Sequence, residues 1–389
     1  MRKTVLWLLC GGILLSSLAA YTSAEQAVNA PGGSDENLIE ELKLFSKAIG
    51  AIVQAYVEDK NPRDLLYAAV KGMLTGLDRY SEFIEKERYE LLEIHMKGEY
   101  AGIGAILEVV DGGPAIKEVQ PGSLAEKAGL LADDRIYEVD HKDVRQMAIG
   151  DVAALIRGEP EVPVLLTLWR PALNKQMDVE IKREKIEIES VHDVRMVGRA
   201  IGYFRISNFQ ANTADQVDAA IKKLDGMGME ALIIDLRNNN GGLMPQAVAL
   251  AERFLPKGDK ILTVKSKIEA QRAEYISSGE HTIPDLPLVI LVNEASASSS
   301  EIFSAAVQDH KRATIVGART FGKASVQSVI PLDDVTAMKL TTARYLSGGG
   351  RMIDQVGLTP DIEVPYHQEG ETKGDSQILK AVELLKDHF

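Results

Sequence analysis

Residues 231–242 read ALIIDLRNNNGG, and residues 288–303 read LVILVNEASASSSEIF. Each stretch joins a short, wholly apolar run to a loop of small and polar residues, and an amphipathic helical pattern follows each loop. Apolar strands that alternate with helices are typical of a largely parallel sheet covered by helices. The sequence therefore predicts an α/β layer in this half of the chain.

The same alternation extends on both sides of these two stretches. It predicts further strands and helices at 201–209, 213–225, 243–254, 298–308 and 313–316. In such sheets, the loops at the carboxyl ends of the strands converge on one edge, where active sites form. Three loops meet this condition, and they lie at 237–242, 293–298 and 317–323.

The loop at 293–298 leads into a helix that starts near Ser298. Backbone N–H groups at a helix start point outward and favour negative charge, so a serine there suits a reaction that develops an oxyanion. However, Ser298 and Glu301 also fit a plain capping box, in which the serine only caps the helix. This segment alone leaves both interpretations open.

The loop at 317–323 supplies Lys323, and Gln327 follows four residues later. None of the three loops contains a histidine, so a serine nucleophile would need another base, and a neutral lysine can serve. Apolar burial lowers the pKa of a lysine, and Gln327 can orient the amine without charging it. Taken singly, Lys323 also fits an ordinary surface lysine.

The spacing of Gly317, Gly322 and Lys323 also matches a phosphate-binding loop. Ala324 stands where such a loop needs a hydroxyl for magnesium, and a strand pattern follows where a helix is required. These departures disfavour nucleotide binding.

The loop at 237–242 ends in Gly241 and Gly242. Glycines free backbone N–H groups to face a bound carbonyl oxygen, and with the N–H of Ser299 they would form an oxyanion hole. A plain turn is the alternative. The sequence does not decide which glycine donates.

Short strands and glycine turns precede this layer, beginning near residue 98. The segments GEYAGIGA at 98–105, PGSLAEKAGL at 121–130 and DRIYEVD at 134–140 resemble a PDZ domain. The resemblance implies a groove in which the C-terminus of a peptide adds to an edge strand.

Three residues of this region match the carboxylate-binding loop of a PDZ domain, namely Gly102, Ile103 and Gly104. Arg157, at the end of a helix expected at 147–157, would carry a positive charge toward the groove. A plain glycine hairpin and a solvated helix terminus are the alternatives for these two features.

The motifs DLRNNNGG at 235–242, SASSSEI at 296–302 and GKASVQ at 322–327, preceded by a PDZ-like region, resemble the carboxyl-terminal processing (tail-specific) serine peptidases. The resemblance implies a crotonase-like (ClpP/crotonase-type) α/β peptidase core that cleaves substrates with apolar C-terminal tails. One departure is Arg79-Tyr80, which replaces the Pro-His that is usual there.

The resemblance also assigns roles to the candidate residues. It implies Ser298 as the nucleophile, Lys323 as the general base and Gln327 as its orienting partner, with Gly241 or Gly242 and Ser299 as oxyanion donors. No metal or other cofactor is implied. A catalytically silent PDZ adaptor protein is the alternative function.

The N-terminus predicts export. Arg2 and Lys3 precede an apolar run, and Thr22-Ser23-Ala24 provides small residues for cleavage, so residues 1–24 fit an export signal that is cleaved or kept as an anchor. The signal contains Cys10, the only cysteine, and its removal excludes thiol chemistry. We therefore expect a periplasmic or outer-face location.

The expected domain organisation follows from these segments. It comprises an export signal at 1–24, a helical region at 25–96, a PDZ domain at 97–183, a Ser-Lys peptidase core at 184–365 and a helical tail at 366–389. The N-terminal helices bury little area alone, which favours a homodimer or an adaptor protein as partner. The formal net charge of −13 argues against a nucleic-acid surface.

Overall fold

The computed structural model describes residues 36–280, 283, 286–333, 336–367 and 374–386. The expected export signal at 1–24 lies outside the described residues. The chain forms two compact units, a large one from Met1–Tyr89 and Ser190–Phe389 and a small one from Glu90–Glu189. The small unit is therefore an insertion in the large one.

The main sheet of the large unit has six strands in the order β10-β11-β12-β15-β16-β19, and only β10 is antiparallel to its neighbour. This arrangement confirms the largely parallel sheet that the apolar runs predict. The strands are β10 (Val191–Val197), β11 (Ile201–Ile206), β12 (Ala231–Asp235), β15 (Leu288–Val292), β16 (Thr314–Gly317) and β19 (Ile362–Glu363).

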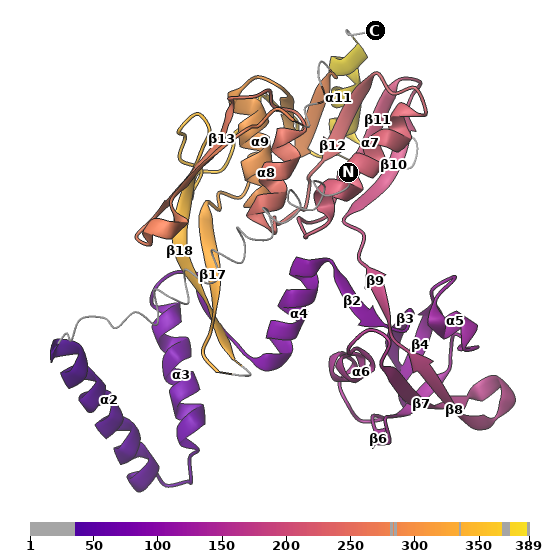
Figure 1. Cartoon of the computed structure of the whole chain (residues 1–389), viewed down its shortest axis with the longest axis vertical. Helices are drawn as coiled ribbons and strands as arrows, with labels where there is room; N and C mark the ends of the chain where they lie inside the picture. Colours follow the sequence, from indigo (N-terminus) through magenta and orange to yellow (C-terminus); the bar gives the residue numbers. More distant parts are fainter. Residues whose placement is uncertain (1–35, 281–282, 284–285, 334–335, 368–373, 387–389) are drawn as a thin grey trace, which may run out of the picture. The chain divides into compact units, whose positions relative to one another are not determined.

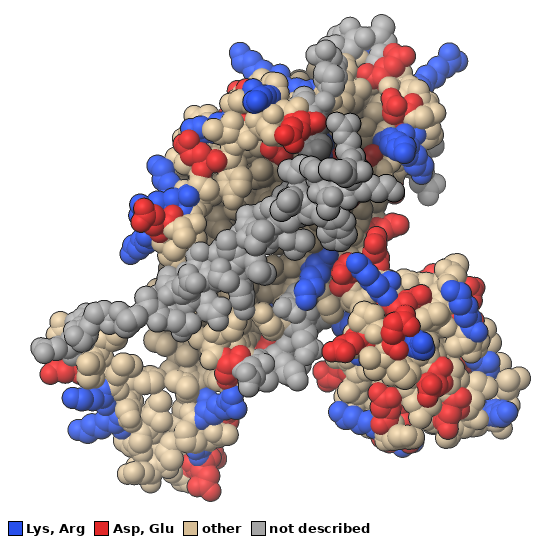
Figure 2. All heavy atoms as spheres, viewed as in Figure 1, with Lys and Arg blue, Asp and Glu red and all other residues tan. Residues whose placement is uncertain are grey.

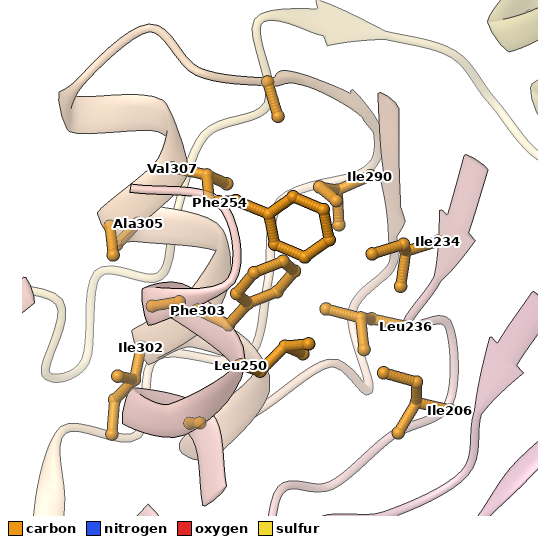
Figure 3. Packing of buried hydrophobic residues seen from close by; sticks show 14 of the residues in the cluster. Ile206, Ile234, Leu236, Leu250, Phe254, Ile290, Ile302, Phe303, Ala305 and Val307 are labelled. Atoms are coloured by element: carbon orange, nitrogen blue, oxygen red, sulfur yellow. The ribbon is translucent and has the colours of Figure 1, made fainter. Parts of the chain in front are cut away.

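Helices cover both faces of this sheet because successive side chains of the buried strands point to opposite faces. Leu232 and Ile234 belong to the core that also contains residues of α7, α8 and α9, whereas Ile233 packs in the core that contains residues of α11. In Figure 3, Phe254 and Phe303 lie between the helices and the strands. The helices are α7 (Thr213–Asp225), α8 (Met244–Glu252), α9 (Ser299–Asp309) and α11 (Ser376–Lys386).

A second, antiparallel sheet lies in the same unit, with the order β1-β18-β13-β14 and with β17 also paired to β18. Within the region expected to be helical at 25–96, the short strand β1 forms instead and pairs with β18 far along the chain. The strands are β1 (Glu82–Ile84), β13 (Lys260–Ser266), β14 (Ala273–Ile276), β17 (Ser325–Pro331) and β18 (Ala337–Ser347).

The N-terminal helices α2 (Glu36–Ala55) and α3 (Pro62–Thr75) present many apolar side chains to solvent. Asn61 caps α3, and its side-chain oxygen accepts a hydrogen bond from the N–H of Arg63. Among the described helices, none has the length and apolar character needed to cross a membrane. The exposed apolar residues of α2 are Leu38, Ile39, Leu42, Leu44, Ile52 and Val53.

The small unit contains a sheet in the order β3-β4-β5-β7-β8, with β3 at one edge and in contact with α6 (Figure 1). Lys and Arg side chains mix with Asp and Glu side chains over the face of this unit seen in Figure 2. The helix α4 (Lys86–Lys97) crosses the boundary between the units. The other elements are β2 (Glu99–Gly102), β3 (Ala105–Val110), β4 (Gly113–Val119), α5 (Leu124–Lys127), β5 (Arg135–Val139), β6 (Lys142–Asp143), α6 (Ile149–Ile156), β7 (Pro163–Arg170), β8 (Lys175–Lys182) and β9 (Glu184–Glu187).

Candidate active site

Ser298 stands at the start of α9, in the loop that follows strand β15. Its φ of 53° lies in the left-handed region, which is strained for a residue with a Cβ and occurs often at functional sites. Side-chain bonds tie this loop to the loop after β12. Ser296 Oγ donates to the carbonyl of Leu236 (2.8 Å), and Ser300 Oγ donates to that of Asn239 (2.9 Å).

The loop after β12 presses Gly241 against Ser298. A Cβ at Gly241 would lie 2.7 Å from the Cβ of Ser298 and 3.0 Å from the backbone nitrogen of Ser299, and the φ of Gly241 is +100°. Only glycine fits this position without displacing the serine.

The two candidate glycines differ in their hydrogen bonds. The N–H of Gly241 donates to Asn239 Oδ1 at 2.8 Å. Within the described residues, no acceptor pairs with the N–H of Gly242 or with that of Ser299. These two N–H groups are therefore available to an oxygen from outside the chain.

Glu301 joins the serine loop to the lysine loop. Its fully buried carboxylate accepts four hydrogen bonds. Oε2 accepts the backbone N–H groups of Ser298 (2.9 Å) and Lys323 (2.8 Å), and Oε1 accepts the N–H of Gly322 (2.7 Å) and the hydroxyl of Thr320 (2.5 Å). Burial raises the pKa of Glu301, whereas the four donors lower it.

Tyr345 holds the same two backbones from their carbonyl side. Its buried hydroxyl lies within hydrogen-bond distance of the carbonyl oxygens of Lys323 (2.7 Å) and Ser298 (3.1 Å). Burial raises the pKa of Tyr345 well above the ordinary value, so the phenol stays protonated and can donate. Ser298 and Lys323 are thus fixed relative to one another by two buried side chains.

The amine of Lys323 is partly buried, and it lies 5.0 Å from the ring centroid of Tyr80. Burial lowers the pKa of Lys323 below its ordinary value, and the charge of Lys339 lowers it further. The carboxylates of Glu301 and Glu82 act in the opposite direction. The net shift favours the neutral amine that the sequence analysis required.

Gln327 lies in β17, and its side-chain amide is hydrogen-bonded to residues of the antiparallel sheet. Its Nε2 donates to Ser325 Oγ (2.7 Å) and Thr341 Oγ1 (3.4 Å). Among the hydrogen bonds of the described residues, none joins Gln327 to Lys323. The structure therefore brings Ser298, Lys323, Ser299 and the two glycines together, and it gives Gln327 other partners.

The residues predicted to bind a peptide tail lie in the small unit. Gly104 has a φ of +82°, and the carbonyls of Ile103 and Gly104 accept N–H groups of Ala125 (2.8 Å) and Gln120 (2.9 Å). The segment from Gly102 to Gly104 therefore turns the chain between β2 and the edge strand β3.

Arg157 caps the C-terminal end of α6, and its guanidinium lies 5.4 Å from the ring centroid of Tyr100. The Nε atom is buried and has no hydrogen-bond partner within the described part of the chain.

Sequence reasoning gave no functional role to Glu301, Tyr345 and Tyr80. The sequence presented Glu301 as one half of a capping box and as part of the motif at 296–302, and the capping bond from the Ser298 N–H does form. Tyr80 was visible only as a departure from the family pattern. In the part of the chain that the structure describes, no cluster of three or more His, Cys, Asp or Glu side chains could hold a metal ion.

We expect Glu301→Gln to destabilise the large unit by about 3 kcal/mol, because the amide NH2 would replace an oxygen that accepts two donors. Urea denaturation measures this loss. Hydrogen exchange of the Gly322 and Lys323 amides should also become faster.

Glu294→Gln is the matched control, because Glu294 is exposed in the loop before Ser298. This control should change stability by less than about 0.5 kcal/mol. Equal stability and equal amide exchange in the two variants would show that Glu301 does not hold the loops.

Comparisons with known proteins identify the family to which the chain belongs. The model of peptidase family S41 matches residues 200–364, and a PDZ domain model matches residues 116–170. A carboxy-terminal-processing protease of Bartonella bacilliformis is 33% identical, over 99% of this chain and 88% of that protein. A probable CtpA-like serine protease of Staphylococcus haemolyticus is 32% identical, over 93% of this chain and 72% of that protein.

A solved structure of a photosystem II D1 C-terminal processing protease is 30% identical, with a TM-score of 0.46, over 83% of this chain and 92% of that one. The range matched by the peptidase model includes the loops that carry Ser298 and Lys323. The chain belongs to the PDZ-containing carboxy-terminal-processing serine proteases of peptidase family S41.

Proposed function

We propose that this protease is exported and cleaves polypeptides with a Ser298–Lys323 dyad after its PDZ domain has bound an apolar C-terminal tail. One observation carries the dyad: a single carboxylate oxygen of Glu301 accepts the backbone N–H groups of both residues. The lowered pKa of Lys323 supports its role as a base.

The reaction begins when the neutral amine of Lys323 takes the hydroxyl proton of Ser298 as Oγ attacks the scissile carbonyl carbon. The resulting oxyanion accepts hydrogen bonds, and the ammonium of Lys323 then protonates the leaving amine as the C–N bond breaks. Water, deprotonated by the same amine, hydrolyses the acyl-enzyme and restores the serine.

Gly242 and Ser299 are the oxyanion donors in this proposal. Their N–H groups have no acceptor within the described residues, whereas the N–H of Gly241 is bonded to Asn239. Gly241 instead allows the close approach of the loop to Ser298. One such donor is commonly worth about 3 kcal/mol in the transition state.

Gln327 is the orienting partner of Lys323 in this proposal only after its side chain turns away from Ser325.

The parallel sheet with helices on both faces, joined to an antiparallel sheet, supports a crotonase-like core. In this proposal, the catalytic loops lie at the carboxyl edge of β12, β15 and β16. This position is the one at which parallel sheets usually hold their active sites.

Tail recognition is proposed for the small unit. The strand β3 forms one edge of its sheet and contacts α6, so a peptide can add as a further strand beside it. The loop of Gly102, Ile103 and Gly104 and the positive charge of Arg157 at the end of α6 would hold the terminal carboxylate.

Export is supported by the basic and apolar pattern of residues 1–24. The exposed apolar side chains of α2 and α3 support contact with a second copy of the chain or with an adaptor protein.

Ser298→Ala and Lys323→Ala should each lower kcat by at least about 10³-fold, because each removes one half of the dyad. The assay is hydrolysis of an unstructured protein with an apolar C-terminal tail, followed by mass spectrometry.

Ser304→Ala and Lys265→Ala are matched controls. Ser304 Oγ is buried in the same helix without a partner among the described residues, and Lys265 is exposed. Full activity of either dyad variant would refute the proposal, and tail binding by the wild type without cleavage would favour a silent adaptor.

The pH dependence of kcat/KM should follow the proton of Lys323. The amine must be neutral, so activity falls as the pH drops through its lowered pKa. Lys339→Met removes a nearby positive charge and one of the two ion pairs of Glu82, whose other partner is Arg88. Both effects favour the ammonium form, so the acidic limb should move to higher pH by about 0.5 to 1 unit. An unmoved limb, or one that moves to lower pH, would contradict Lys323 as the base.

Arg157→Ala should raise KM about tenfold for a substrate with a free C-terminal carboxylate, with little change in kcat, because a charged hydrogen bond is lost. The same substrate with an amidated C-terminus is the control, and its KM should not respond to the substitution. Equal KM changes for both substrates would mean that Arg157 does not bind the carboxylate.

A further inference from the structure

A short turn brings Tyr80 into the large unit next to the lysine loop. Asp78 Oδ1 accepts the N–H groups of Tyr80 (2.7 Å) and Ser81 (2.8 Å), and Asp78 Oδ2 accepts the hydroxyl of Ser81 (3.0 Å). Ser81 Oγ in turn accepts the N–H of Thr341 in β18 (3.1 Å). These bonds fix the turn on the antiparallel sheet.

Two cationic side chains lie close to the ring of Tyr80. The ring centroid lies 5.0 Å from the Nζ atom of Lys323 and 4.9 Å from the guanidinium carbon of Arg79. Arg79 also lies 5.1 Å from the ring centroid of Phe321, two residues before Lys323. The turn therefore contacts the lysine loop twice, through the Tyr80–Lys323 pair and through the Arg79–Phe321 pair.

The hydroxyl of Tyr80, unlike its ring, makes no polar contact within the described residues. Its oxygen is buried, and it has no hydrogen-bond partner within the described residues. Replacing the hydroxyl by hydrogen removes no hydrogen bond, so Tyr80→Phe separates the ring from the hydroxyl without structural loss.

We propose that Tyr80 is a positioning residue of the catalytic dyad, whose aromatic ring holds the Lys323 amine and stabilises its protonated form. This inference rests on the role of Lys323 proposed above. An ammonium is attracted to the face of an aromatic ring, whereas a neutral amine gains much less. The ring therefore acts most strongly once Lys323 has taken the serine proton.

The ring opposes the effect of burial on Lys323. Burial and Lys339 favour the neutral amine, and a ring contact favours the ammonium, so Tyr80 limits how far the pKa falls. Such a limit is useful, because the same group must first accept a proton and then donate it to the leaving amine. The other charged or titratable groups near Lys323 are Glu301 of α9, Glu82 of β1, Lys339 and Tyr345 of β18, and Arg79.

Tyr80→Leu tests the ring. We expect the pKa of Lys323 to fall by about one unit, which corresponds to the loss of a partly buried cation–π contact. We also expect kcat to fall about tenfold with KM unchanged. Tyr80→Phe should restore both quantities to within a factor of about two of the wild type, because the phenylalanine ring keeps the same face.

Two readouts follow the amine. The first is the acidic limb of the kcat/KM profile. The second is the rate of reductive methylation of Lys323 against pH, measured by mass spectrometry on the full chain with Ser298→Ala, which needs no proteolysis. Tyr56→Leu is the matched control, since the exposed Tyr56 makes a similar contact with Lys60 at 5.1 Å. It should leave the titration of Lys323 unchanged.

The outcomes separate the two proposals. If Lys323→Ala retained activity, the proposed dyad would fail, and the methylation experiment would still show whether the ring holds the amine. An unchanged or raised pKa of Lys323 in Tyr80→Leu would overturn the inference. So would a Tyr80→Phe variant that behaves like Tyr80→Leu, because the hydroxyl and not the ring would then be responsible.

Discussion

The buried carboxylate of Glu301 is the constraint on which the candidate active site depends. It accepts hydrogen bonds from the start of α9 and from the loop before β17. Ser298 and Lys323, which donate two of these bonds, are more than twenty residues apart in the sequence. Moving any of these donors away would leave a buried polar group unsatisfied, which costs about 1–3 kcal/mol. The carboxylate therefore determines the spacing of the Ser298 and Lys323 backbones, and Tyr345 secures the same spacing from the carbonyl side.

Strain and close contact accompany this arrangement. Ser298 keeps a positive φ, and Gly241 touches it where any side chain would collide. Such features persist only where the surroundings hold them in place. Here the surroundings are side-chain bonds from Ser296 and Ser300 to the neighbouring loop, together with the packed core beneath α9. The rigid sheet thus supports loops that would not adopt this geometry alone.

The proposed mechanism assigns separate roles to the two units. All the residues proposed for bond cleavage belong to the large unit, and those proposed for tail binding belong to the small unit, which has its own hydrophobic core. Because the small unit is inserted, two segments of chain connect it to the large one. The N-terminal part of the large unit also reaches the lysine loop, since Arg79 and Tyr80 contact Phe321 and Lys323.

The sequence by itself determined the features that depend on neighbouring residues. The apolar runs of β12 and β15 and the helical pattern after each gave the parallel sheet, and the short motifs gave Ser298, Lys323 and the glycines as candidates. Tertiary structure decided the rest, because hydrogen bonds between distant segments leave no local pattern. The pairing of β1 with β18, the hydrogen bond that engages Gly241 but not Gly242, the partners of Gln327, and the contacts of Glu301 and Tyr80 all depend on which loops the folded sheet brings together.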